Sequence, residues 1–536
     1  MKRKKLLLLT TALLLLTGCM RMMPKLDETY LQSMDGVNAD AEHTTIRILL
    51  FGETSGLEPV LDELHRQMDA DQLGLRMDIT TVPASEYVSA LSLKLQSRED
   101  LDLVFNAPWM NLGSLIDSGM CMDLSSFFNN SAYPGLEKAF PADYIEANKF
   151  YRRVYAVPIT NAYHDPLGIY YRKDLLRSAG LGFDTITNEE ELLAFYEAAL
   201  QLWPELSPLS LGNRGFHTMT MNDMYFRTKN VYDIPGWPVW DYPGKIVLDA
   251  TGEKVLDAVF AGDELSRFQQ LGFTTDLLSD FLVKNAAYAK YTQSSSMLST
   301  SQDQLFFQGK SLSMEGELSA CSLDVQDRLR RLVPDAEVAF WSYEWIFAEE
   351  NRGVTAIPSM MQAWNFLCVP SYSPKTSQAM RLLDWLYSDR NRLELLSYGL
   401  PDVDWQPMDE DSYVLLQPEG RDYQFPAYEM TWSPIYNRIR SGLPDSEREL
   451  TQYVFDNSNY AKVSLSGWTL NTTAISIEIA QLNALYRSYA PAFKHGAFGD
   501  LTDEKIMEMH EKSRELGLET IRQEIIRQAQ YYLDTD

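Results

Sequence analysis

The order of apolar and polar residues in the first part of the chain predicts alternating strands and helices. Residues 46–51 are apolar except for Arg47 and are typical of a buried strand, and residues 75–82 alternate as a second strand. Residues 58–68 and 87–95 carry apolar side chains at helical spacing, and a third strand is expected over residues 101–105. This order predicts a mostly parallel sheet with helices on both faces, where ligands gather at the carboxyl ends of the strands.

A second group of elements follows residue 158. We expect a strand over residues 168–171 and a helix over residues 188–202 that Asn188 caps. Two further strands are expected over residues 311–314 and 338–340. The pattern therefore predicts a second α/β unit that follows the first along the chain.

The pattern then predicts a return of the chain to the first unit. We expect a strand over residues 365–369, a helix over residues 375–388 and a last amphipathic helix over residues 518–533. These elements predict an α/β protein of two lobes with doubly wound mixed sheets, joined by a hinge of about three crossings. The expected boundaries are 46–158 and 341–395 for the N-terminal lobe, 159–340 for the C-terminal lobe, and 396–536 for a helical C-terminal extension that packs on the lobes.

The N-terminus has the features of an export signal. Basic residues from Lys2 to Lys5 precede an apolar run over residues 6–16, which is too short to span about 30 Å of hydrocarbon as a mature helix. The run ends at Leu16-Thr17-Gly18-Cys19, which resembles the lipobox of bacterial lipoproteins. That resemblance implies that residues 1–18 are removed and that a lipid on Cys19 holds the protein on the extracellular face of the cell membrane. An ordinary secretory signal with an incidental cysteine is the alternative.

The charge and the cysteine content restrict the classes of partner and the covalent cross-links that we expect. Residues 19–45 show no apolar period and are expected to be a tether. The net charge of −28 repels nucleic acids and anionic membrane surfaces, and no later apolar run is long enough to span a membrane. Cys121, Cys321 and Cys368 sit at wide spacing, so we expect three buried thiols, with one disulfide and a spare thiol as the alternative.

Several blocks of sequence resemble the solute-binding proteins of a known class of importer. The blocks are residues 102–127, 155–160, 305–318 and 363–389. They are similar to extracellular solute-binding proteins of ATP-binding-cassette (ABC) importers, of the large type that captures sugars and oligosaccharides. Residues 459–498 resemble the extra C-terminal domain of a Gram-positive lipoprotein subgroup. Residues 432–437 depart from the Trp-x-Phe-Gly-Asn pattern of that subgroup, so we assign no ligand residue there.

The resemblance implies a fold, a function and partners. The fold is the type II periplasmic-binding-protein-like fold, and the function is capture of a carbohydrate, most simply an oligosaccharide, in a cleft between the lobes. The implied partners are a small-molecule sugar and the permease subunits of an ABC importer, with the lipid as the membrane attachment. We expect a monomer that needs no cofactor and binds no nucleic acid.

Aromatic residues are abundant, and some of them are candidates for stacking on sugars. The chain contains Trp 11 and Tyr 29. The best candidate is Trp109, because it follows a strand and Pro108 at the edge where a doubly wound sheet exposes its ligand loop. Packing in the core or at the hinge is the alternative for each candidate. The candidate ligand residues are Trp109, Asn106, Glu53, Asn161, Tyr163, Glu317, Trp345 and Trp364.

Catalytic and metal-binding patterns are missing from the sequence. A glycoside hydrolase needs two carboxylates roughly 5 to 10 Å apart, and no spacing among the acidic residues singles out a pair. Glu315 and Glu317 alternate on a strand end, so only one of them can face a cleft. The histidines never reach the His-x-x-x-His spacing of a zinc helix. We therefore assign no catalytic and no metal-binding residue, and a lipid-anchored glycoside hydrolase and a peptide-binding protein remain the alternatives.

Overall fold

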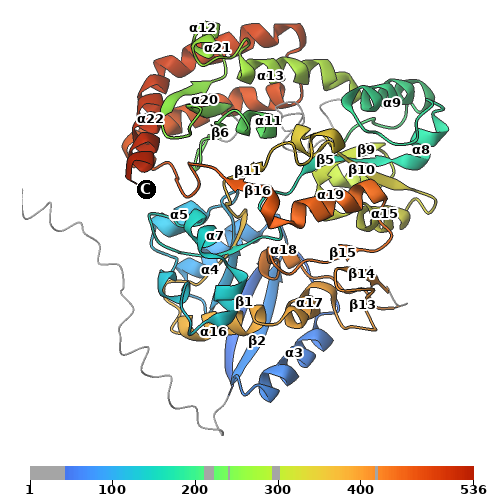
Figure 1. Ribbon diagram of the computed structural model, residues 1–536, viewed down its shortest axis with the longest axis vertical. Coiled ribbons are helices and arrows are strands. Elements are labelled where there is room, and N and C mark those ends of the chain that lie inside the picture. The colour runs from blue at the N-terminus through green and yellow to red at the C-terminus, as the bar shows by residue number, and fades with distance from the viewer. Residues whose placement is uncertain (1–42, 211–222, 240–241, 293–301, 417–419, 536) are drawn as a thin grey trace, which may run out of the picture.

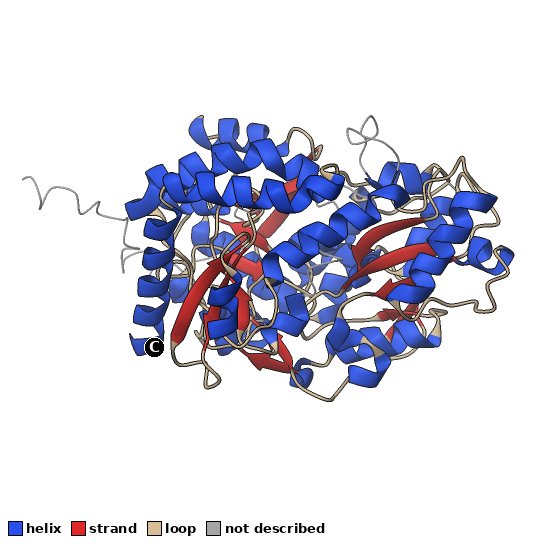
Figure 2. Cartoon of the chain, turned by 90° about the horizontal axis from the view of Figure 1, so that it is seen from above, coloured by secondary structure: helices blue, strands red, loops and turns tan. Residues whose placement is uncertain are grey.

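The computed structural model describes residues 43–210, 223–239, 242–292, 302–416 and 420–535. Cys19, the expected signal peptide and most of the expected tether lie outside the described residues. The first sheet lies at the bottom of Figure 1, and the C-terminal helices lie at the top beside helices from the middle of the chain. Seen from above, the strands lie inside and the helices largely outside (Figure 2).

The first sheet has five strands in the order β2-β1-β3-β12-β4. β1, β2 and β3 are parallel, and β12 runs antiparallel to both β3 and β4. The strands are β1 (Thr44–Phe51), β2 (Leu75–Val82), β3 (Leu103–Asn106), β4 (Val157–Ile159) and β12 (Asn365–Cys368). The surrounding helices are α3 (Glu58–Ala70), α4 (Tyr87–Gln96), α5 (Leu112–Asp117), α6 (Pro134–Ala139), α7 (Ala142–Ala147), α16 (Thr376–Tyr387) and α17 (Arg390–Tyr398). Residues 365–369 and 379–396 share one buried core with residues 46–159, because β12 brings the chain back into this sheet.

The second sheet has the order β10-β5-β9, and its pairs are all antiparallel. Its strands are β5 (Leu167–Arg172), β9 (Ser313–Glu317) and β10 (Val338–Ser342), with helices α8 (Lys173–Ser178), α9 (Glu189–Leu202), α14 (Gln302–Phe307) and α15 (Ser322–Arg330). Because side chains alternate along β5, Ile169 and Tyr171 pack in the core with α9, whereas Tyr170 packs in the core with α15. Gly168 is required for close packing, since a Cβ there would lie 2.3 Å from the carbonyl oxygen of Trp341.

A third sheet, β6-β7-β8, belongs to a core that joins distant parts of the chain. Buried side chains of residues 226–282 pack with those of residues 463–529 in one cluster. The elements are α11 (Asp223–Arg227), β6 (Val231–Asp233), β7 (Gly244–Leu248), β8 (Val255–Phe260), α12 (Leu265–Gln270), α13 (Leu277–Tyr288), α20 (Ser476–Lys494), α21 (Thr502–Glu515) and α22 (Leu518–Thr535). In Figure 1 the green helix α13 lies beside the red helices α20 and α21, which it also contacts.

Several segments connect the two lobes. Residues 160–166 join β4 of the first sheet to β5 of the second, and residues 343–364 return from β10 to β12. A third connection runs through the last third of the chain. Its elements are β13 (Trp405–Pro407), β14 (Ser412–Leu415), α18 (Ala427–Met430), β15 (Ile439–Arg440), α19 (Asp445–Phe455) and β16 (Tyr460–Lys462). β16 pairs with β11 (Ile357–Ser359), which lies in the segment that returns from β10 to β12.

Most of the predicted elements are confirmed. The strand over residues 75–82 has the expected bounds, and the helix over residues 188–202 is α9, where the Asn188 side chain accepts a hydrogen bond from the Glu191 N–H at 3.0 Å. The strand expected over residues 311–314 begins two residues later, at Ser313. The described cysteines Cys121, Cys321 and Cys368 form no disulfide, and Cys321 is half-buried rather than buried.

Candidate functional site

Four strand ends bring predicted ligand residues to one edge of the first sheet. Because β1, β3 and β4 point the same way and β12 points the opposite way, the ends of the first three meet the start of β12. Glu53 follows β1, Trp109 follows β3, Asn161 follows β4 and Trp364 precedes β12. This is the edge where a sheet of this kind presents its ligand loops.

Trp109 and Trp364 form an exposed aromatic surface at this edge, here called the tryptophan platform. The indole N–H of Trp109 donates to the carbonyl oxygen of Trp364 at 2.9 Å. Trp109 is 45% exposed and Trp364 is 55% exposed. The ring of Trp109 packs on Phe51 and Phe105, with centroids 5.9 Å and 6.2 Å away. Part of the Trp109 indole is therefore buried, and both tryptophans leave surface available for contact with another molecule.

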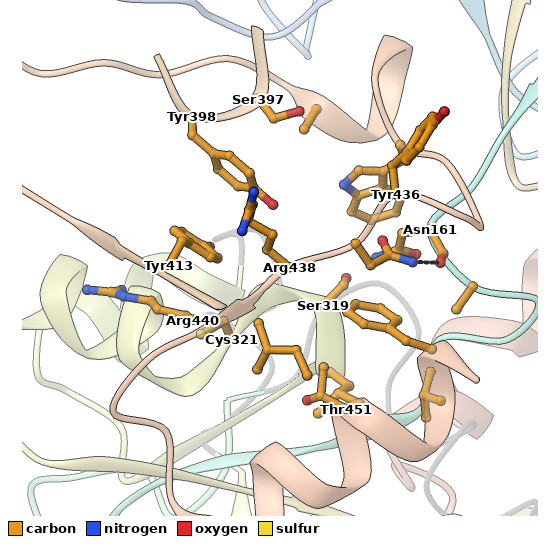
Figure 3. Close-up of a pocket in the computed structure, with 18 of the residues that line it drawn as sticks. Asn161, Ser319, Cys321, Ser397, Tyr398, Tyr413, Tyr436, Arg438, Arg440 and Thr451 are labelled. Atoms are coloured by element: carbon orange, nitrogen blue, oxygen red, sulfur yellow. Dashed lines mark hydrogen bonds between the residues drawn. The ribbon is translucent and has the colours of Figure 1, made fainter. Parts of the chain in front are cut away.

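A cavity of about 140 Å³ lies where the connecting segments meet the two lobes. Figure 3 shows Tyr398, Tyr413 and Arg438 at one end of this pocket and Tyr436 and Asn161 at the other. The backbone oxygen of Asn161 accepts a hydrogen bond from the Asn437 side chain at 2.8 Å. The lining residues come from the crossing after β4, from the end of β9 to α15, from α17 and from residues 413–455. Both lobes therefore contribute to the walls of the pocket.

A chain of aromatic rings links this pocket to the tryptophan platform. Trp432, which lines the pocket, packs edge-on against Tyr428 at 6.1 Å. Tyr428 packs edge-on against Phe105 at 6.1 Å, and Phe105 packs against Trp109. Packed rings thus join the pocket and the platform into one aromatic region, although neither Trp109 nor Trp364 lines the pocket.

The arginines in the pocket are already paired with carboxylates. Arg438 donates to Glu394 at 2.6 Å, and Arg440 forms ion pairs with Asp324 and Asp327. Burial raises the pKa of Asp165 to about 7, with a further contribution from the negative charge of Glu317. Because the cations are neutralised and a buried acid resists ionisation, the pocket suits uncharged hydroxyl-bearing ligands better than anions.

The other predicted ligand residues have mixed surroundings. Asn106 is buried, and its side chain is engaged by the Ala107 N–H at 2.7 Å and by Asn111 at 2.9 Å. Tyr163 lies between the rings of Tyr144 and Tyr460, each with its centroid 5.5 Å away. Asn106 is therefore engaged within its own loop, and Tyr163 has the contacts of a packed residue in the crossing after β4.

Glu53, Glu317 and Trp345 lie at the ends of strands near the crossings. Glu53 is exposed, and Glu317 ends β9 opposite Leu167, where the chain enters the second sheet. Trp345 follows β10 and packs edge-on against Tyr225 at 5.8 Å. Glu317 and Trp345 therefore belong to the second lobe, whereas Glu53 shares its sheet edge with Trp109.

Several pocket residues were not among the predicted ligand residues. Trp432, Tyr436 and Asn437 line the pocket. No ligand residue was predicted there, because residues 432–437 depart from the Trp-x-Phe-Gly-Asn pattern. Tyr398 and Tyr413 also line it, and their rings stack at 4.4 Å. The aromatic content of residues 398–436 was the available signal in the sequence.

The described part of the chain contains no group of three or more histidine, cysteine, aspartate or glutamate side chains that could hold a metal ion. None of the described helices combines the length and the apolar character needed to cross a membrane.

Two family models match parts of the chain. Residues 71–203 match the bacterial extracellular solute-binding protein family, and residues 464–534 match a domain of unknown function, DUF3502. The second match covers the C-terminal part of the core that also contains β6, β7 and β8. A comparison with curated proteins found no significant match.

Solved structures with the same fold cover nearly the whole chain. An N-glycan transport solute binding protein from Streptococcus pneumoniae has 17% sequence identity and a TM-score of 0.68, and the alignment covers 92% of this chain and 99% of that chain. The same protein in complex with Man5GlcNAc gives 16% identity and a TM-score of 0.65, with 92% and 99% covered. A solute binding protein of Bifidobacterium longum infantis that binds HMO and is associated with an ABC transporter gives 14% identity, a TM-score of 0.55, and the same coverage. The resemblance seen in the sequence is therefore confirmed, and the chain has the architecture of a bacterial extracellular solute-binding protein with an added C-terminal domain.

Proposed function

We propose that this protein captures an oligosaccharide between its two lobes and delivers it to an ABC importer. The observation that carries the proposal is the half-exposed tryptophan platform at the carboxyl edge of the first sheet, joined by aromatic rings to the pocket between the lobes. The match of residues 71–203 to solute-binding proteins supports it. The fold shared with an N-glycan transport solute binding protein, whose structure is also known in complex with Man5GlcNAc, supports it as well.

Each part of the site has a task in this proposal. Indole rings cover the apolar faces of sugar rings, while amide and carboxyl groups such as those of Asn161 and Glu53 hydrogen-bond to hydroxyl groups. The lobes close on the ligand because contacts from both lobes exist only in the closed form, and a ligand shifts an equilibrium by its differential affinity for the two forms. Glu317 and Trp345 supply the second lobe's contacts.

The same proposal includes an anchor, a partner and a domain plan. A lipid on Cys19 holds the protein on the extracellular face of the membrane, and the closed monomer docks on the permease subunits. The lobes comprise residues 46–158 with 341–395, and residues 159–340, with the boundary adjusted so that β10 (Val338–Ser342) and Trp345, which follows it, belong to the second lobe. The extension over residues 396–536 shares its core with residues 226–282 of the second lobe. The protein binds sugar without cleaving it.

The test is a thermal-shift panel combined with mass spectrometry of the glycans. The purified protein is incubated with Man5GlcNAc, with human milk oligosaccharides, with xylo-oligosaccharides and with short peptides. We expect a rise in the unfolding midpoint with at least one oligosaccharide, and we expect that glycan to be recovered intact. Cleavage products would favour a glycoside hydrolase, and a rise with peptides alone would favour a peptide-binding protein.

A further inference from the structure

Glu429 is a fully buried carboxyl group inside the aromatic region. It belongs to α18, and its side chain is 0% exposed. Its Oε2 atom accepts a hydrogen bond from the backbone N–H of Phe51 at 2.6 Å. Phe51 is the last residue of β1, and its ring packs against Trp109. One side chain therefore connects the last third of the chain to the strand end that supports the tryptophan platform.

No cation offsets a charge on Glu429 among the described residues that influence it. The groups that favour its ionised form are the Phe51 N–H and the hydroxyl of Tyr428. Tyr87 of α4 is close enough for a charge on Glu429 to act on it, and Cys368 of β12 acts on Tyr87 as well. These neighbours are all neutral at physiological pH, so burial dominates and raises the pKa of Glu429 to about 8.

Other buried carboxylates of this region have the partners that Glu429 lacks. Glu394 pairs with Arg390 at 2.7 Å and with Arg438 at 2.6 Å. Glu447 accepts a hydrogen bond from the Ser322 N–H at 2.8 Å and another from the Ser322 hydroxyl. The Oε1 atom of Glu429, in contrast, has no hydrogen-bond partner among the described residues. A negative charge on that atom would require water to enter between α18 and the first sheet.

We propose that Glu429 is a positioning residue of the ligand site, whose buried carboxyl group keeps α18 seated on the first sheet and holds the end of β1 in place against Trp109. The role of Glu429 at the ligand site rests on the proposed function, whereas its role in holding α18 and the end of β1 together does not. Loss of the proton strengthens the hydrogen bond from Phe51, but it leaves a buried charge whose desolvation cost is larger, so water enters, α18 loosens from the sheet and, through Phe51, the support of the tryptophan platform weakens.

The pH dependence has a defined direction. An acid whose pKa is higher in the folded protein than in the opened form stabilises the closed arrangement at low pH. That stabilisation is lost as the pH rises from the ordinary glutamate value toward about 8, and it levels off above that value. With one proton involved, the opening equilibrium changes about tenfold per pH unit within this window.

The first experiment measures hydrogen exchange at the Phe51 amide, corrected for the intrinsic exchange rate, at pH 5.5, 6.5 and 7.5. We compare the wild-type protein with Glu429→Gln, which keeps the acceptor but cannot ionise, and with the matched control Glu449→Gln at an exposed position on α19. We expect protection in the wild type and in the control to fall about tenfold per pH unit. Protection in Glu429→Gln should stay constant. If that variant does not fold, a constant protection in the wild type overturns the proposal by itself.

The second experiment measures the affinity for Man5GlcNAc, or for the glycan that the panel identifies, at pH 7 and pH 9. We expect affinity to fall at pH 9 in the wild type and in Glu449→Gln but not in Glu429→Gln. A pH-dependent Phe51 amide with a pH-independent affinity overturns the positioning role. If no glycan binds at all, the proposed function fails, while exchange at Phe51 still decides whether the proton holds α18 on the sheet.

Discussion

Replacement of Trp109 by alanine should weaken glycan binding, and the exposed area of the Trp109 side chain determines the expected loss of affinity. The side chain is 45% exposed. A fully buried tryptophan hides roughly 150–250 Å², so about 100 Å² of Trp109 remains for a ligand to cover. At roughly 25 cal/mol per Å² this area contributes about 2.5 kcal/mol, which corresponds to about a 70-fold loss of affinity.

The same change should also cost some stability, because Trp109 packs on Phe51 and Phe105 and donates a hydrogen bond to Trp364. We expect about 2 kcal/mol, below the range of about 3–5 kcal/mol for a fully buried tryptophan. Isothermal titration calorimetry and urea unfolding measure the two quantities separately. Ile526→Ala is the matched control, since Ile526 is also partly buried but lies in the C-terminal core. Trp109→Ala with normal affinity and reduced stability would show that Trp109 is only a packing residue.

Two further changes test other parts of the account. Cys19→Ser should release the protein from the membrane or leave its signal uncleaved, because a diacylglycerol anchor contributes about 0.8 kcal/mol per buried methylene; a processed, membrane-bound variant in cell fractionation would disprove lipidation. Arg522→Met should lower the free energy of unfolding by about 3–5 kcal/mol, because Asp263, which is buried and 2.7 Å away, would lose its partner. The double variant with Asp263→Leu should recover much of that loss in urea unfolding, and equal losses in both variants would contradict this explanation.

Local patterns were enough to predict the sheet edge on which the site is built. The strand over residues 75–82 and the turn after residue 105 follow from alternation and from Pro108, and they put Trp109 at the expected strand end. The return of β12 to the first sheet was also expected from its apolar run. Trp364, which precedes that strand, lies at the same edge as Trp109.

Distant pairings were not visible in the sequence. The strands β6, β7 and β8 are short, and their core is completed by residues 463–529, so no local period indicates it. The pocket could not be predicted for the same reason. Tyr398, Tyr413 and Trp432 line it together with Asn161, which is more than 200 residues away in the sequence. Asn106 was predicted as a ligand residue, but its side-chain amide donates a hydrogen bond to the nearby Asn111 side chain. The position of Asn106 at a strand end did not indicate this local contact.

Closure of the lobes on an intact oligosaccharide is the central claim, and small-angle X-ray scattering tests it most directly. The radius of gyration is measured without ligand and with a saturating concentration of the glycan that binds in the panel, and the glycan is recovered afterwards for mass spectrometry. The account predicts a smaller radius with the glycan and an unchanged glycan mass. An unchanged radius at saturation, with binding verified by calorimetry, would contradict capture between the lobes.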